Sequence, residues 1–235
     1  MSRLDVDERE PVSWSDWPLR GWALGRLLVA YLVLVAVGLG LGGLLVHTPV
    51  GEPIVAEDVD VSEWIATERE PTLTEISVWA SKPGGTIPVV TIVVGLSIAF
   101  ALAFKRWRES ATLTTALSLE ALVFLTVSTL VGRSRPPIEQ LDSSPPTASF
   151  PSGHVGAATA LYLTLAIIVW WRTESALVRG IAVFLAVALP VSVAFSRLYR
   201  GMHFVTDVAV GLLLGAAAAW VAIRVVTTAS ERRAT

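Results

Sequence analysis

The chain alternates between long apolar segments and shorter polar connections. Helices are the economical way to carry an apolar segment through lipid, because they satisfy every backbone N–H and C=O internally. Six segments come near the length that crosses a hydrocarbon core as a helix: residues 23–46, 86–104, 112–132, 155–171, 178–195 and 204–226. The pattern therefore predicts an all-α fold, a bundle of six transmembrane helices.

Polar stretches at the two ends suggest a division into three parts. Residues 1–22 mix acidic and basic side chains with three Trp, and we expect a polar N-terminal tail whose Trp side chains anchor at the membrane surface. Residues 23–228 would form one membrane domain, and residues 229–235 a polar C-terminal tail. The first apolar segment is too long for a secretory signal and its leader too acidic, so we expect it to be retained as a span.

The connection at residues 47–85 is long for a loop. Its apolar side chains gather in two pieces, one on each side of Pro71. We expect two short amphipathic helices that lie on the membrane surface. The alternative is a lid or a guide for a substrate.

Composition agrees with a membrane protein, since apolar residues make up 53% of the chain and charged residues only 16%. A soluble domain has roughly 25% charged residues. The net charge of −2 gives no indication of a nucleic-acid partner. The absence of Cys excludes a disulfide framework, a thiol nucleophile and a thiolate metal site.

Basic residues predict the orientation, because they gather on the cytoplasmic side of membrane proteins. The first loop between spans is rich in acids, which places it outside. With both termini in the cytoplasm, twelve of the 18 Lys and Arg residues lie inside: Arg3, Arg9, Arg20, Arg26, Lys105, Arg106, Arg108, Arg172, Arg179, Arg224, Arg232 and Arg233. The chain is thus expected to be a multi-pass protein of the cell membrane.

Two features inside the spans stand out. Gly38-x-x-x-Gly42 and Gly211-x-x-x-Gly215 would allow helices to approach closely. Glu120 falls in the middle of the third segment, where a bare carboxylate is costly, so it must be protonated, paired or facing water. Both a functional role and a structural hydrogen bond fit it.

Three polar pieces interrupt the apolar pattern at the outer ends of spans: residues 133–136, 151–154 and 196–207. His203 and Asp207 are four residues apart, a spacing that places them on one face of a helix. The Asp can then accept a hydrogen bond from one imidazole nitrogen and leave the other as a nucleophile or base.

The second piece, Pro151-Ser-Gly-His154, opens the fourth span. Ser152 is a natural N-cap, Gly153 lets a ligand approach the backbone, and a helix N-terminus binds anions. His154 could protonate a leaving oxygen there. Arg135 and Arg197 add planar, permanently charged groups that suit phosphate oxygens.

Together these pieces resemble the three signature motifs of the type-2 phosphatidic acid phosphatase superfamily, the membrane lipid phosphate phosphatases. The second motif, Pro-Ser-Gly-His, and the third, Ser-Arg-x5-His-x3-Asp, match completely at residues 151–154 and 196–207. The first motif, Lys-x6-Arg-Pro, matches only at Arg135-Pro136, because Ser128 stands where the family usually has Lys.

The resemblance implies a two-step mechanism without a metal or another cofactor. His203 would attack phosphorus and form a phosphohistidine, Asp207 would orient His203, and His154 would protonate the leaving oxygen. The remaining motif residues would hold the phosphate: Arg135, Arg197, Ser152 and the Gly153 amide. Either Arg133 or a weaker hydrogen bond from Ser128 would replace the missing Lys, or the departure marks a changed substrate or a weakened enzyme.

The expected function is hydrolysis of a lipid phosphate or pyrophosphate at the outer face. Topology and the family resemblance favour polyprenyl pyrophosphate slightly over phosphatidic acid and phosphatidylglycerol phosphate. Two alternatives remain, a phosphotransferase and a non-hydrolytic protein that binds or transports lipid phosphates. Ser128 favours the non-hydrolytic reading, whereas the complete set of His203, Asp207 and His154 argues against it. The expected partners are the substrate and the lipid bilayer.

Overall fold

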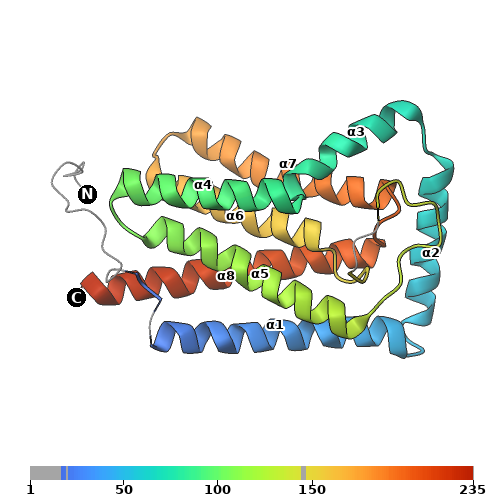
Figure 1. The fold of residues 1–235 in the computed structure, drawn as a ribbon, viewed down its shortest axis with the longest axis horizontal. Coiled ribbons are helices and arrows are strands. Elements are labelled where there is room, and N and C mark those ends of the chain that lie inside the picture. The colour runs from blue at the N-terminus through green and yellow to red at the C-terminus, as the bar shows by residue number, and fades with distance from the viewer. Residues whose placement is uncertain (1–16, 20, 144–146, 235) are drawn as a thin grey trace.

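The structure is a computed structural model that describes residues 17–19, 21–143 and 147–234, the last three by their backbone alone. Every regular element within these ranges is a helix (Figure 1). The α-helices are α1 (Trp22–His47), α2 (Glu52–Thr67), α3 (Pro71–Ser81), α4 (Thr86–Phe104), α5 (Arg108–Val131), α6 (Gly153–Arg172), α7 (Ala176–Tyr199) and α8 (Val205–Ala234), with a short 3₁₀ turn η2 (Lys82–Gly84) between α3 and α4.

Six segments of the described chain are long and apolar enough to cross a membrane, and α1 and α4 to α8 supply them. The bounds of α1 and α4 to α7 lie within four residues of those predicted, and α8 begins one residue later and ends eight residues later than predicted. The predicted six-helix transmembrane bundle is therefore confirmed. The predicted N-terminal tail falls largely outside the described residues. The predicted C-terminal tail is helical as far as Ala234, since α8 continues through it.

The bundle has a centre of three helices and a periphery of three. About half of the apolar stretch of α5, α6 and α8 is buried, against 22% or less in α1, α4 and α7. α1 packs on α5 and α8, α4 packs on α5, and α7 packs on α6. The peripheral helices present Val, Leu, Ile and Phe side chains outward, as helices in contact with lipid do.

The predicted glycine contacts are present. A Cβ atom on Gly211 of α8 would lie 2.6 Å from the Ser152 carbonyl oxygen, and one on Gly215 would collide with the Gly156 carbonyl oxygen of α6. On α1, a Cβ atom on Gly38 would lie 2.7 Å from a methyl group of Val127 in α5. Glycine at these positions therefore lets α8 approach α6 and α1 approach α5.

The long connection forms α2 and α3, two helices separated at Pro71 as predicted. In Figure 1, α2 runs across one end of the bundle, where it packs against α1, α7 and α8. The junction between α2 and α3 is fastened to α7. The Glu70 amide donates to the Tyr199 hydroxyl (2.9 Å), and Arg69 Nε donates to the Tyr199 carbonyl (3.1 Å).

α1 begins and α8 ends at the same end of the bundle, and α2 covers the opposite end (Figure 1). Near the first end, buried Glu109 accepts from Arg106 (2.6 Å) and pairs with Arg172 (3.0 Å). An even number of spans produces this arrangement. The cytoplasmic location of both termini stays a prediction.

Candidate functional site

The three motif pieces meet at the end of the bundle that α2 covers. α5 ends because Gly132 adopts a left-handed conformation (φ 63°), and its N–H donates to the Ser128 carbonyl (3.2 Å). The chain then crosses to Ser152, where α6 begins. A second glycine with positive φ, Gly201 (φ 69°), turns the chain after α7 and leads through His203 into α8. The ends of α5 and α7 and the starts of α6 and α8 thus share one site.

His203 lies just before α8 rather than on it, so the predicted shared helix face does not describe the pair. Its Nδ1 lies 2.7 Å from the Ser149 carbonyl oxygen and 3.8 Å from Asp207 Oδ2. The second distance is too long for a hydrogen bond. Because a carbonyl only accepts, Nδ1 carries the proton and Nε2 keeps its lone pair. The Ser149 carbonyl, and not Asp207 as predicted, is therefore the group that fixes the tautomer.

Asp207 organises the loops around His203. Its side chain is fully buried (0% exposed), and it accepts from the Phe204 amide (2.9 Å), from the Ser149 hydroxyl and from Arg133 Nη1 (2.6 Å). Asp207 is the third residue of α8, and Phe204 is the residue just before the helix. The hydrogen bond from the Phe204 amide to the Asp207 carboxylate is therefore one of the two bonds of a capping box. Asp207 therefore acts on His203 through Ser149 and through its charge.

The surroundings of His203 keep its imidazole neutral. Burial lowers the pKa of His203 below its ordinary value, and the nearby Asp207 carboxylate, which acts in the opposite direction, does not restore it. At neutral pH the Nε2 lone pair is therefore available. An uncharged imidazole with one free nitrogen has the form that a nucleophile requires.

Arg133 binds Asp207 and does not line the cavity beside the histidines. It is 6% exposed, and it forms ion pairs with Asp207 Oδ1 (2.6 Å) and with Asp58 Oδ2 of α2 (2.8 Å). Thr206 joins the network, since its amide donates to Asp58 Oδ1 (3.2 Å). The predicted use of Arg133 as a phosphate ligand receives no support from these contacts, because two carboxylates hold its guanidinium group.

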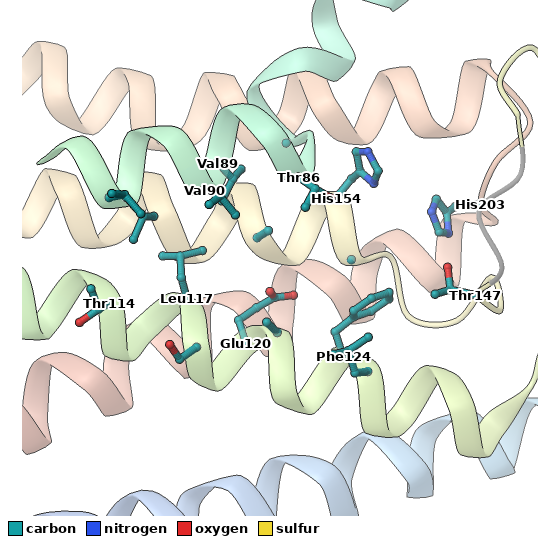
Figure 2. Close-up of a pocket in the computed structure, with 18 of the residues that line it drawn as sticks. Thr86, Val89, Val90, Thr114, Leu117, Glu120, Phe124, Thr147, His154 and His203 are labelled. Carbon is teal, nitrogen blue, oxygen red and sulfur yellow. The ribbon is translucent and has the colours of Figure 1, made fainter. Parts of the chain in front are cut away.

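A cavity of about 520 Å³ extends from this site into the bundle between α4, α5 and α6 (Figure 2). Arg135, Thr147, Gly153, His154 and His203 line one end of it. Most of the remaining wall is apolar, and it includes side chains that are exposed on the outer surface of the bundle: Val90, Val94 and Leu125. The cavity therefore joins two histidines and a cation to the surface that faces lipid.

Arg135 and Arg197 are placed differently around the histidines. Arg135 lines the cavity and is held by the carbonyl oxygens of Met202 (Nη1, 2.5 Å) and Thr147 (Nη2, 3.1 Å). Arg197 Nη2 donates to Asp142 Oδ2 (2.8 Å) and to the Ser81 hydroxyl (2.5 Å). Its buried Nε has no partner within the described part of the chain. Both guanidinium groups can thus still donate to an anion.

Ser152 occupies the predicted N-cap position of α6, but its side chain makes no capping hydrogen bond. Its hydroxyl group is buried and has no partner among the residues that the structure describes. An unpaired hydroxyl beside the N-terminus of a helix is suited to an anion. The next residue, Gly153, packs against Phe124, whose ring lies 2.8 Å from where a Cβ atom would stand.

Asp142 was not identified from the sequence. Its carboxylate pairs with Arg197 (2.8 Å) and with Arg200 (2.6 Å). Burial by itself would raise the pKa of Asp142, but the hydrogen bonds and charges of Arg200 and Arg197 outweigh it and hold this pKa below its ordinary value. Asp142 thus stays ionised and holds Arg197 in position.

Ser128, where the family usually has Lys, is 2% exposed, and its hydroxyl group has no partner in the described chain. It does not line the cavity. Among the described residues that do, Arg135 is the one Arg or Lys. The cation that the family usually supplies at this position has no replacement in the cavity wall of the described chain.

Two solved structures share this fold. One is the first transmembrane PAP2 type phosphatidylglycerolphosphate phosphatase from Bacillus subtilis, with a TM-score of 0.65 and 24% identity over 90% of this chain and 98% of that chain. The other is LpxE from Aquifex aeolicus, with a TM-score of 0.55 and 22% identity over 70% of this chain and 93% of that chain. At these identities the likeness establishes the fold alone. No curated protein sequence matched the chain.

The sequence model of the PAP2 superfamily matches residues 110–231. This range covers more than half of the chain. It contains the three motif pieces, with His154, His203 and Asp207. The fold that the chain shares with the two solved structures agrees with this match. The chain therefore belongs to the PAP2 superfamily.

Proposed function

We propose that the protein is an integral membrane phosphatase that removes phosphate from a lipid phosphate or pyrophosphate through a phosphohistidine intermediate. The observation that carries the proposal is the cavity. A single space connects His203, His154 and Arg135 with apolar walls that reach the lipid-facing surface. A phosphate group at one end and a hydrocarbon chain along the walls would fill it.

In the first step, Nε2 of His203 attacks phosphorus while the bond from phosphorus to the leaving oxygen breaks. His154, which shares this end of the cavity with His203 (Figure 2), gives its proton to the leaving oxygen. The Ser149 carbonyl holds Nδ1–H and therefore keeps Nε2 directed at the substrate. The products are a free lipid alcohol, or a lipid monophosphate from a pyrophosphate, and a phosphohistidine.

In the second step, water attacks the phosphohistidine and the bond from nitrogen to phosphorus breaks. His154 takes the proton from water and so returns to its starting form. Inorganic phosphate leaves, and His203 is neutral again. The same two histidines therefore serve both steps, with the lipid leaving in the first and phosphate in the second.

Four groups donate hydrogen bonds to the phosphate oxygens and stabilise the negative charge that develops on them: Arg135, Arg197, Ser152 and the Gly153 amide. The unpaired Arg197 Nε and the unpaired Ser152 hydroxyl support these assignments. Arg133 has a different role in this proposal. It positions Asp207, and through Asp207 the Ser149 carbonyl that orients His203.

The experiment that tests this function is phosphate release by the purified protein in detergent. The panel holds phosphatidic acid, phosphatidylglycerol phosphate and a polyprenyl pyrophosphate. We expect release from at least one lipid and no release by the His203→Ala variant. Binding without release would support the transport or binding alternative. Transfer of labelled phosphate to an added alcohol in preference to water would identify a phosphotransferase.

A further inference from the structure

Glu120 has no role in the mechanism above, yet it forms part of the cavity wall (Figure 2). It projects from α5, and its neighbours in the wall are largely apolar: Leu117, Ala121, Phe124 and Ala157. It is 5% exposed. No residue that the structure describes offers its carboxyl group a hydrogen bond or an ion pair.

The depth of Glu120 follows from its contact with α6. Its Oε1 packs against Gly156, where a Cβ atom would collide with it. Gly156 lies one turn into α6, since its amide donates to the Ser152 carbonyl (3.0 Å). One turn rises about 5.4 Å. The carboxyl group therefore lies about one helical turn deeper than the N-terminus of α6, where the phosphate would bind.

A buried carboxyl group without a hydrogen-bond partner is destabilising, whether it is ionised or protonated. A Leu side chain would occupy similar space without this cost. The carboxyl group is directed into a cavity that already has the features of a ligand site. Its missing partner is therefore best supplied by the ligand.

Resting on the proposed phosphatase function, we propose that Glu120 selects lipid phosphates with a glycerol backbone. Such a lipid carries an ester carbonyl or a hydroxyl group within about one helical turn of the phosphorus atom. A protonated carboxyl group donates to an ester carbonyl, and a hydroxyl group pairs with either form of the carboxyl. Glu120 is thus a specificity residue that contacts the segment between the phosphate and the hydrocarbon chains.

A polyprenyl pyrophosphate fits this cavity less well. If the polyprenyl chain lies at the depth of Glu120, the carboxyl group faces hydrocarbon and stays unpaired. If the second phosphate lies there, two acidic groups face each other. The structure therefore shifts the preference away from the polyprenyl class that the sequence alone favoured.

The test compares wild type with Glu120→Leu and Glu120→Gln on two substrates, dioctanoyl phosphatidic acid and dodecyl phosphate, which lacks the esters. Glu120→Leu should lower kcat/KM for the phosphatidic acid at least about tenfold, as expected for one lost hydrogen bond in a water-poor cavity. It should not lower kcat/KM for dodecyl phosphate, and is expected to raise it, because this substrate places hydrocarbon against the unpaired carboxyl group of wild type. Glu120→Gln keeps an N–H donor and should retain most of the preference.

Equal losses on both substrates would overturn the proposal and indicate a structural role for Glu120. Faster turnover of a polyprenyl pyrophosphate than of phosphatidic acid by wild type would also overturn it. Thermal unfolding with each lipid gives a readout that needs no turnover. Phosphatidic acid should raise the Tm of wild type more than that of Glu120→Leu. If phosphatidic acid raises the two Tm values by these different amounts but the protein releases no phosphate, the phosphatase function is contradicted, whereas recognition of the lipid by Glu120 is supported.

Discussion

The contacts of individual side chains assign the charged residues of the site to two tasks. Arg135 lines the cavity beside the histidines and Arg197 has a buried Nε without a partner in the described chain, whereas Arg133 binds Asp58 and Asp207. Arginine suits both tasks because its planar group donates in several directions at once. The phosphate would therefore be bound with one cation fewer than in relatives that have the family Lys.

Ser128→Lys tests this shortage directly. Ser128 lies seven residues before Arg135 on a buried face of α5, at the position where the family motif has Lys. We expect kcat/KM to rise about tenfold, because a hydrogen bond to a charged group contributes roughly 1.5–3 kcal/mol. Ser128→Ala is the matched control and should change little. A folded Ser128→Lys protein with unchanged rates on a short-chain lipid phosphate would contradict this.

The sequence predicted that the two histidines, Asp207 and Arg135 would lie together, because they stand in fixed patterns at span ends, and the fold places them at one site. It missed Ser149, Asp58 and Asp142. An acid in a polar loop looks like a solvated acid until the fold places an arginine opposite it. Ser149 acts through its backbone carbonyl, which carries no signature in the sequence.

Among the elements, α2 belongs to the connection between the first two spans and contacts the end of the bundle that holds the motifs. Asp58 projects from α2 onto Arg133, which in turn binds Asp207. The helices themselves were predictable, because their apolar pattern is local and Pro71 separates them. Their docking was not, since it depends on partners far away in the sequence. These contacts favour a fixed part of the site over a mobile lid.

Asp58→Asn should therefore impair catalysis although Asp58 lies outside the cavity. The loss of one carboxylate lets Arg133 and Asp207 shift, and small displacements of catalytic groups can cost on the order of 10²-fold in rate. We expect kcat to fall by about that factor with little change in KM. Asp60→Asn, an exposed change on the same helix, is the control. A higher kcat in Asp58→Asn would instead identify α2 as a lid.

At the scale of the whole molecule, the bundle separates its two ends. The motif loops and α2 lie at one end, and the start of α1 and the end of α8 lie at the other (Figure 1). The six spans were predictable because length and apolarity decide whether a segment crosses a membrane. The cavity was not, since it arises from the way α4, α5 and α6 pack.

The orientation in the membrane can be tested with single cysteines, because the natural chain has none. The bias of basic residues predicts that the motif end faces outward. Cys introduced at exposed Ser143, in the motif loop, should react with an impermeant maleimide in intact cells. Cys at exposed Ser175, at the opposite end, should react only after lysis. The reverse pattern would place the site in the cytoplasm.

The central claim is that His203 becomes phosphorylated during turnover. The most direct measurement is to mix the protein with a labelled short-chain lipid phosphate, quench it under alkaline denaturing conditions and locate the phosphate by mass spectrometry. We predict a phosphohistidine at His203 that is absent from His203→Ala and that accumulates in His154→Ala on a substrate with a good leaving group, since water activation is then slowed. Turnover without phosphate on His203, or a label on another side chain, would contradict the account.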